Sequence, residues 1–157
     1  MSTFDSKSAA DPARLLDSVG RQILRLLQED ARLPFSEIGR QVGLTAPAVA
    51  ERVKKMEEAG IITGFHAAVD PAKLGLGLTA YLHVTAHNGR CDPVRVFAEE
   101  QPAITECYCI AGDRDLLLKG TFESVEQLQQ LVDHLLKYGS VSTTLVLATY
   151  LPRRSLG

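Results

Sequence analysis

The sequence lacks both an excess of charge of either sign and a long apolar run. Its 157 residues include 17 Lys and Arg against 19 Asp and Glu, a net charge of −2, and 45% of them are hydrophobic. This balance is typical of a folded globular protein and excludes an intrinsically disordered chain, which has few apolar residues and a high net charge. Because no run of about 18 uncharged apolar residues exists, we predict no membrane span. The overall charge does not indicate a nucleic-acid partner, so any DNA-binding surface must gather its positive charge locally.

Cysteine is scarce, with three residues at Cys91, Cys107 and Cys109. A sparse, odd number argues against a disulfide framework, and no matching CxxC or His pair completes a zinc site. We interpret all three as small, half-buried core residues in a reducing cytosol, and we predict a cytoplasmic location. The first ten residues are rich in Ser and Ala and lack the apolar segment of a secretory signal, so we interpret residues 1–13 as a flexible tail.

Signatures of catalysis are missing as well. The sequence contains no P-loop, no nucleophile elbow and no dinucleotide-binding fingerprint, and no pair of acidic residues has a convincing base. His83 and His87 fall on one face of a predicted strand, but four residues of strand place them about 13 Å apart, too far for one metal ion. We therefore predict neither an enzyme nor a cofactor or metal site.

The first half of the chain predicts three helices. From Leu16 onward, apolar residues recur at steps of three and four, the signature of one buried helix face. A second, short helix begins at Ser36, a good N-cap residue, and ends at Gly43, which can adopt the left-handed conformation of a C-cap. A third helix begins with Thr45 as its N-cap and runs to about Ala59.

The second and third of these helices have the pattern of a helix-turn-helix, in which the later helix enters the major groove of DNA. Small side chains at its tip let the backbone approach the bases, and Glu51 can accept a hydrogen bond from a cytosine amino group. Basic residues further along would bind phosphates, which gives affinity but not sequence specificity. The residues predicted to contact DNA are Ser36, Thr45, Ala46, Pro47, Ala50, Glu51, Arg52, Lys54 and Lys55.

A three-helix bundle with a solvated charged face is the alternative interpretation of the same pattern. Between residues 32 and 55, five basic residues stand against two acidic ones. This is only a modest local excess of positive charge in a chain that is acidic overall.

The second half predicts strands and helices in the order β-α-β-β-α-β. The strands are expected at residues 76–85, 104–111, 115–122 and 141–151. One helix begins at Asp92 and ends near Pro102, and another begins at Ser124, which has the capping-box spacing to Gln127. This order is typical of the ferredoxin-like fold, a four-stranded antiparallel sheet with both helices on one face. The whole chain is therefore predicted to be α+β.

Two of these strands place apolar side chains on both faces of the sheet, in the runs 116–118 and 145–147. Helices can cover only one face. The simplest cover for the other is a second copy of the sheet, so we predict a two-fold homodimer.

One long segment, DARLPFSEIGRQVGLTAPAVAERVKKMEEAGIITGFHAAVDPAKLG, resembles the N-terminal half of the Lrp/AsnC (feast/famine) transcriptional regulators. The family usually has Asp where this chain has Gly20, so we expect a polar contact of the first helix to be missing. Gly39 stands where Ala is common. The matching pieces are Asp30–Arg32, Gly43–Thr45, Arg52–Lys55, Gly60–Ile62, Phe65 and Asp70–Gly75.

The resemblance continues in TECYCIAGDRDLLLKGTF, which is similar to the effector hairpin of the same family and carries its markers Gly112, Asp113, Asp115 and Lys119. It implies that a small effector, usually an amino acid, binds there at the junction between dimers. An ammonium group favours a carboxylate, and a ligand carboxylate favours an Arg or the N–H groups of a glycine turn. The alternative is a plain hairpin turn with a solvated Asp115. The residues implied are Tyr108, Ile110, Gly112, Asp113, Arg114 and Asp115, together with Thr143 and Thr144 from the last strand.

We therefore expect a tail at residues 1–13, a helix-turn-helix (winged-helix-like) DNA-binding domain at 14–61, a linker strand at 62–76 and a ferredoxin-like effector-binding and oligomerisation domain at 77–151. The expected function is sequence-specific regulation of transcription by a homodimer on double-stranded DNA, assembling to an octamer, without a membrane partner. The alternative is an oligomeric metabolite-sensing module without productive DNA binding. Glu51 and Glu58 place negative charge on the exposed face of the third helix, so this alternative function stays open.

Overall fold

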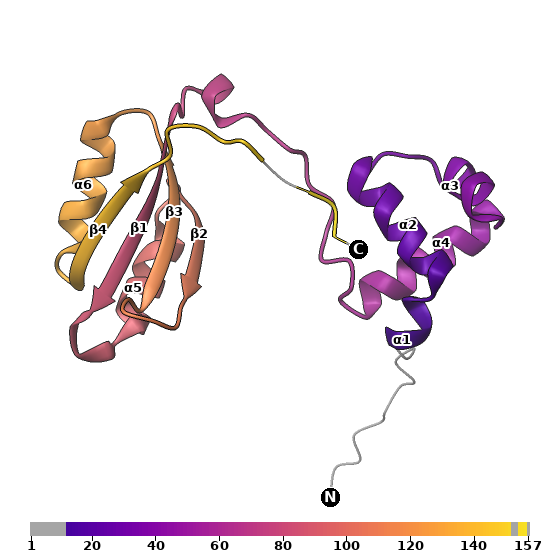
Figure 1. The fold of residues 1–157 in the computed structure, drawn as a ribbon, viewed down its shortest axis with the longest axis horizontal. Helices are drawn as coiled ribbons and strands as arrows, with labels where there is room; N and C mark the ends of the chain where they lie inside the picture. The colour runs from indigo at the N-terminus through magenta and orange to yellow at the C-terminus, as the bar shows by residue number, and fades with distance from the viewer. Residues whose placement is uncertain (1–11, 152–153, 157) are drawn as a thin grey trace, which may run out of the picture. The chain divides into compact units, whose positions relative to one another are not determined.

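A computed structural model of the chain describes residues 12–151 and 154–156 (Figure 1). The chain divides into two compact units. The first holds the residues up to Ala68 together with the C-terminal segment from Leu151, and the second is Val69–Tyr150. In the described part of the chain, no helix is both long enough and apolar enough to cross a membrane. Most of the predicted tail lies outside the described residues, and α1 begins at Pro12.

The described residues of the first unit form helices joined by turns and coil, with no strand among them, so the winged part of the predicted domain is not seen there. Its elements are α1 (Pro12–Leu15), α2 (Ser18–Glu29), α3 (Phe35–Val42) and α4 (Ala46–Glu58). Apolar side chains at helical spacing form the core, as the sequence pattern predicts. The buried members from these helices include Ile23, Leu27, Ile38, Val49, Val53 and Met56.

The turn between α3 and α4 confirms two of the predicted caps and corrects a third. Gly43 ends α3 with a left-handed backbone (φ 73°), and the Thr45 side chain accepts a hydrogen bond from the N–H of Ala48 (3.4 Å) at the start of α4. Ser36 is not the N-cap of α3, because the helix already begins at Phe35. Pro34 is the cap, and its carbonyl accepts the first helical hydrogen bonds although its side chain offers no acceptor.

Two glycines let helices pass close to neighbouring backbone. A Cβ atom added at Gly20 would lie 1.8 Å from the carbonyl oxygen of Leu15, and one at Gly39 would lie 2.4 Å from that of Leu44. Both distances are far below van der Waals contact. Gly20 therefore does more than lower helix propensity, since it permits the tight entry of the chain from α1 into α2.

The second unit confirms the predicted β-α-β-β-α-β order and antiparallel sheet. The sheet order is β2-β3-β1-β4. Residues 62–76, predicted as a linker strand, form no strand, and a 3-10 helix occupies part of them instead. The elements are η1 (Pro71–Leu74), β1 (Leu78–Ala86), η2 (His87–Gly89), α5 (Cys91–Glu100), β2 (Ile104–Cys109), β3 (Leu116–Phe122), α6 (Val125–Leu135) and β4 (Gly139–Leu145).

One face of this sheet packs against α5 and α6 and forms the core. The buried side chains include Leu82, Val84, Leu118 and Phe122 from the strands, with Val94, Ala98, Leu128, Leu131 and Leu135 from the helices. Alternate residues point to the opposite side, which we call the open face. Leu117 lies there, half-buried, as predicted, but most other positions are polar. The open face carries Tyr81, His83, Thr85, Glu106, Tyr108, Leu117, Lys119, Ser142 and Thr144.

The last strand and the cysteines differ from prediction. β4 begins at Gly139, where a Cβ would lie 2.1 Å from the carbonyl oxygen of Thr85, and it ends at Leu145 instead of Leu151. Of the apolar run 145–147, only the first residue therefore belongs to a strand. Cys107 and Cys109 are exposed and not half-buried, because β2 is an edge strand of the sheet.

Candidate functional site

The predicted DNA-contacting residues lie on α4 and its cap, except for one on α3. Ser36 is exposed in the first turn of α3. Pro47 occupies the first turn of α4, where its missing N–H costs no hydrogen bond. Most of the set is exposed, and the half-buried members are Ala46, Ala50 and Arg52. The tip of α4 therefore presents small side chains, as contact with base edges requires.

Two lysines of this face are ion-paired with glutamates one turn away. Lys55 Nζ lies 3.2 Å from Glu51 Oε1, and Lys54 Nζ lies 3.8 Å from Glu58 Oε1. Such exposed i,i+4 pairs contribute only about 0.3–0.5 kcal/mol. They can therefore be exchanged for phosphate contacts at small cost, although they reduce the positive potential of the free helix.

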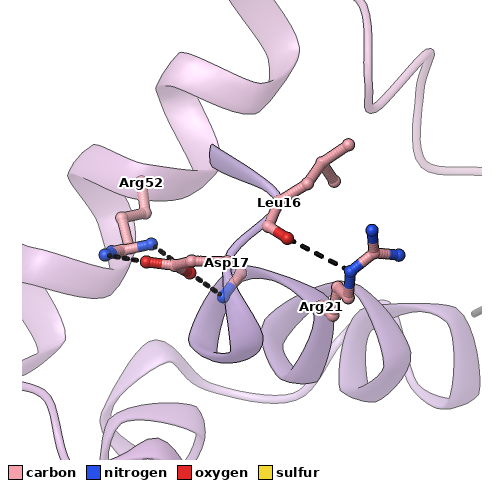
Figure 2. A network of polar contacts seen from close by, with 5 residues as sticks. Leu16, Asp17, Arg21 and Arg52 are labelled. Carbon is pink, nitrogen blue, oxygen red and sulfur yellow. Dashed lines mark hydrogen bonds and ion pairs between the residues drawn. The ribbon is translucent and has the colours of Figure 1, made fainter. Parts of the chain in front are cut away.

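Arg52 has a different partner, Asp17, as Figure 2 shows. Its guanidinium donates from Nη1 to Asp17 Oδ1 (3.0 Å) and from Nη2 to Asp17 Oδ2 (2.9 Å). The same carboxylate caps α2 by accepting from the N–H of Gly20 (2.7 Å). These contacts lower the pKa of Asp17, the hydrogen bond from Arg52 most of all. Gly20 has no side chain to make the polar contact that was expected to be missing, and Asp17 instead ties the first turn of α2 to α4.

This bidentate pair fixes α4 against the N-terminus of α2. A fork of two parallel hydrogen bonds orients both side chains more strictly than a single ion contact does. The neighbouring bond from Arg21 Nε to the carbonyl oxygen of Leu16 (3.1 Å) closes the same turn from its other side (Figure 2). Arg52 is the predicted DNA contact whose charge is committed to holding the helices in register.

Glu37 on α3 forms a second polar network that the sequence did not single out. Arg40 donates to both of its carboxylate oxygens (2.6 and 3.0 Å), and Gln41 Nε2 donates to Oε1 (2.9 Å). These bonds lower the pKa of Glu37 to about 2, chiefly through Arg40. Arg40 and Gln41 follow Glu37 by three and four residues on one helix, and this spacing could have predicted the contacts from the sequence.

The predicted effector hairpin is closed by backbone bonds and anchored to β1. Ile110 N donates to Asp115 O (2.9 Å), and Asp115 N donates to Val84 O (3.0 Å). The Asp115 carboxylate accepts from the N–H of Ala86 (2.8 Å). One oxygen of Asp115 is therefore committed to the fold, which gives this residue a positioning role that its GDxD spacing did not reveal.

Asp113 and Arg114 carry the exposed charges of the hairpin. The Asp113 side chain is 93% exposed, and its Oδ2 lies 3.8 Å from Arg114 Nε. Arg114 also donates from Nη1 to Thr85 Oγ1 (3.2 Å), which directs it toward the open face. Gly112 has a positive φ (148°), and a Cβ there would meet open space. A carboxylate and a guanidinium beside a glycine turn can pair with the two charged ends of an amino acid.

Tyr108 lies in a cluster on the open face. Its hydroxyl donates to Glu106 Oε2 (2.7 Å), and Lys119 Nζ lies 2.9 Å from Glu106 Oε1. Lys119 and Tyr108 lower the pKa of Glu106, while the bonds to Glu106 raise the pKa of Lys119 and of Tyr108. The sequence analysis did not include Glu106 among the site residues. Its position two residues before Tyr108 on β2 places both side chains on the same face of the sheet, and this spacing could have indicated it.

Thr143 and Thr144 lie on β4, which β1 separates from the hairpin strand β3. Thr144 is opposite Tyr81, four residues along β1 from Thr85, which contacts Arg114. Four residues of strand span about 13 Å. The structure of one chain therefore does not bring these two threonines to the hairpin.

Two family models match most of the chain. A model described as the AsnC-type helix-turn-helix domain matches residues 16–57, and one described as the Lrp/AsnC ligand binding domain matches residues 79–156. The first span contains α2, α3 and all but the last residue of α4, and the second contains the hairpin and all but the first residue of the sheet.

Individual proteins match over nearly the same range. The chain is 38% identical over 125 residues to the HTH-type transcriptional regulator LrpB of Bacillus subtilis (strain 168), covering 80% of this chain and 84% of that protein. The structure of B. subtilis LrpC superposes with a TM-score of 0.83 at 30% identity, covering 88% and 99% of the two chains. A transcriptional regulator from Neisseria meningitidis, NMB0573, in complex with L-Met, gives a TM-score of 0.84 at 28% identity, covering 90% and 96%.

Proposed function

The chain belongs to the Lrp/AsnC family of transcriptional regulators, a family of regulators and not of enzymes, and from this premise we propose that it binds specific double-stranded DNA as a homodimer. The recognition helix is α4, and two copies of it enter the major groove about one helical turn apart on a pseudo-palindromic site. The observation that carries this proposal is the α3–α4 turn, in which a left-handed Gly43 and the Thr45 cap present a tip of small side chains. As a DNA-binding regulator, the protein acts in the cytoplasm.

The residues of α4 divide into two kinds of contact. Thr45, Ala46, Pro47, Ala50 and Glu51 meet base edges, where short side chains and one acceptor can read sequence. Lys54 and Lys55 exchange their glutamate partners for phosphates, with Ser36 contacting the backbone from α3. Arg52 contributes through Asp17 by holding α4 in place.

The effector is an amino acid, and it binds at the hairpin. The regulator in complex with L-Met supports an amino-acid ligand for this kind of domain. Asp113 receives the ammonium group, and Arg114 with the N–H groups at Gly112 receives the carboxylate. Asp115 positions the hairpin, and Tyr108 and Ile110 line its approach. Thr143 and Thr144 contact the effector only where a second copy of the chain brings its own β4 to this hairpin. Such a contribution is consistent with an effector site between dimers.

The homodimer forms through the open face, and dimers assemble further to an octamer. The sheet has helices on one side, and Leu117 with Tyr81 supplies apolar surface on the other. Dimerisation presents two recognition helices at once, which compensates for the weak positive charge of each.

DNA binding is tested by mobility shift of the full chain at two salt concentrations with selected DNA. We expect Lys54→Ala and Lys55→Ala each to weaken binding for every sequence and to reduce the salt slope by about one. Lys73→Ala is the control, because it removes the same charge from an exposed position outside the helix-turn-helix, and it should leave binding unchanged. Binding that has no salt slope, or that ignores both lysine variants, contradicts the proposal.

The effector is tested by a thermal-shift screen of the twenty amino acids. A ligand at 100 times its Kd stabilises the folded chain by about 2.7 kcal/mol. We expect Asp113→Asn to abolish the shift and Glu123→Gln, an exposed acid elsewhere in the same unit, to preserve it. A shift that survives Asp113→Asn places the ligand elsewhere.

A second candidate is an oligomeric metabolite sensor that does not bind DNA productively. The ion pairs of α4 favour it, since Glu51, Glu58 and Asp17 each hold one of the cations of that helix. Failure to enrich any sequence in an in vitro selection, with amino-acid binding intact, would support this candidate over the first.

A further inference from the structure

The second unit contains a shallow cavity, open to solvent, beside the N-terminus of α5, apart from the hairpin residues assigned above. Its volume is about 210 Å³, below the roughly 300–1,000 Å³ typical of pockets for drug-sized ligands. It lies between the loop that follows β1 and the turn that joins α6 to β4. The residues that line it are His87, Asn88, Arg90, Pro93, Lys137 and Tyr138.

The lining of this cavity is basic in a unit that is acidic. Val69–Tyr150 holds six Lys and Arg against ten Asp and Glu, and no Asp or Glu lines the cavity. Three of the six, Arg95, Arg114 and Lys119, are ion-paired with carboxylates.

Of the remaining three cations, two line the cavity, Arg90 and Lys137, and the third is Lys73 in η1. No described residue forms an ion pair with Arg90 or Lys137. Two cations without an ion-pair partner and a histidine thus line one cavity, and a bound anion would balance the charge of the two cations.

The loop that carries these groups is held in shape by bonds to the rest of the unit. His87 N donates to the carbonyl oxygen of Tyr138 (2.8 Å), and Arg90 N donates to that of His87 (3.2 Å). The Tyr138 ring packs 5.6 Å from the ring of Phe97 on α5. Asn88 adopts the left-handed backbone (φ 56°) that Asn tolerates better than most residues. The backbone of the loop that lines the cavity is therefore held in place by the fold.

We propose that this cavity binds a small anion, a carboxylate- or phosphate-bearing metabolite, as a second ligand site distinct from the hairpin. The Arg90 guanidinium matches a carboxylate or phosphate with two hydrogen bonds, and Lys137 supplies a point charge. α5 has no side-chain cap, but Asp92 in its first turn already complements the helix dipole, so the binding of an anion rests on Arg90 and Lys137.

The same loop connects the cavity with the hairpin. Ala86, directly before His87, donates its N–H to the carboxylate of Asp115 (2.8 Å). An anion bound to Arg90 and Lys137 adds contacts to the loop after Ala86, and the bond from Ala86 to Asp115 links this loop to the hairpin. This site goes beyond the amino-acid site proposed above, and it does not require that site to exist.

The test is isothermal titration calorimetry on the full chain with inorganic phosphate and, separately, with succinate. We expect saturable binding of at least one probe, which identifies whether phosphate or carboxylate is the preferred class. Arg90→Gln and Lys137→Gln should each weaken binding by about tenfold or more, since each removes a hydrogen-bonding charge from the site. Lys73→Gln is the matched control, because it removes the same charge from the same unit outside the cavity, and it should leave the affinity unchanged.

Three outcomes overturn this proposal. Neither probe binds in a saturable way, or Lys73→Gln weakens binding as much as the two cavity variants, which makes the effect one of general charge. In the third outcome, Arg90→Gln and Lys137→Gln weaken DNA binding alone, so that the cations serve the DNA backbone. Asp113→Asn separates this site from the proposed function, because it should abolish amino-acid binding while the affinity for phosphate or succinate is retained.

Discussion

At the scale of single residues, Asp17 shows how one side chain can serve two helices. It caps α2 and also receives the Arg52 guanidinium, so one carboxylate both begins a helix and fixes the recognition helix. The resemblance implied the loss of a contact at Gly20, because it compares residue types position by position and does not show which partner can reach Arg52 across the fold. Residue contacts of this kind depend on tertiary geometry.

Gly20 should not accept a side chain. We expect Gly20→Ala to destabilise the first unit by about 2 kcal/mol or more, because the new methyl group would overlap the Leu15 carbonyl and crowd Met56. The measurement is chemical denaturation followed by circular dichroism. Gly77→Ala is the control, since a Cβ there meets open space. Equal stability of the two variants would show that α1 and α2 can separate at no cost.

Glu37 should titrate well below an ordinary glutamate. Its pKa falls from 4.5 to about 2, mainly through Arg40 and next through Gln41. Because the folded pKa is depressed, the contribution of this network to stability is present above the ordinary value and is lost as the pH falls from about 4.5 toward 2. The side-chain carboxyl shift of Glu37 in NMR measures this directly.

The two partners of Glu37 provide graded variants. Arg40→Gln should return the midpoint of Glu37 most of the way to its ordinary value, and Gln41→Ala should return it by less, in the order of their contributions. If Glu37 titrates at an ordinary glutamate pKa in the unmodified chain, the network does not persist in solution.

At the scale of elements, helix caps were predictable where a side chain does the capping. Thr45 and Ser124 begin α4 and α6 as their local sequence indicated. The start of α3 was misplaced because Pro34 caps with its backbone alone, which composition does not signal. The end of β4 was misplaced because the apolar run after Leu145 continues the pattern of a strand, whereas the paired residues of β1 and β4 end at Ala80 and Leu145.

The ion pairs of α4 should restrain DNA binding. We expect Glu58→Gln to free Lys54 and to increase the affinity for nonspecific DNA by about two- to threefold, since an exposed i,i+4 pair is weak. The readout is fluorescence anisotropy with a DNA of unrelated sequence at low and high salt. Glu57→Gln removes the same charge from the same helix without breaking either lysine pair and provides the control.

A larger gain for Glu58→Gln than for Glu57→Gln would show that the pair itself restrains Lys54. Identical gains would mean that only net charge matters, and no gain for either would place α4 away from the DNA.

At the scale of the whole molecule, the sequence predicted two units and the order of strands, but not the chemistry of the open face. Apolar runs indicated that both faces needed a cover. The register instead places two mixed rows across all four strands. One row is Tyr108, Leu117, His83 and Ser142, and the other is Glu106, Lys119, Tyr81 and Thr144. A partner for this face must satisfy hydrogen bonds and ion pairs as well as bury Leu117, which favours a matched surface over a merely apolar one.

A second copy of the chain is the partner that we propose, so a charge in the middle of the open face should separate the dimer. Leu117→Lys brings a cation beside Lys119, and two copies would bring these cations face to face. Thr144→Lys tests the same face from an exposed position on β4, where a change is less able to disturb the fold of one copy. We expect both variants to show the mass of a single chain by light scattering while their circular dichroism is retained.

DNA affinity should fall in the variants that separate the dimer. A single recognition helix loses the advantage of two linked half-sites, which is worth about a hundredfold or more. Gln130→Lys, an exposed position on α6 away from the open face, adds the same charge and should leave both mass and affinity unchanged. If the open-face variants keep the mass and DNA affinity of the unmodified chain, assembly uses another surface. If their mass falls but the affinity does not, each copy binds DNA alone, and the weak charge of α4 is then sufficient without a partner.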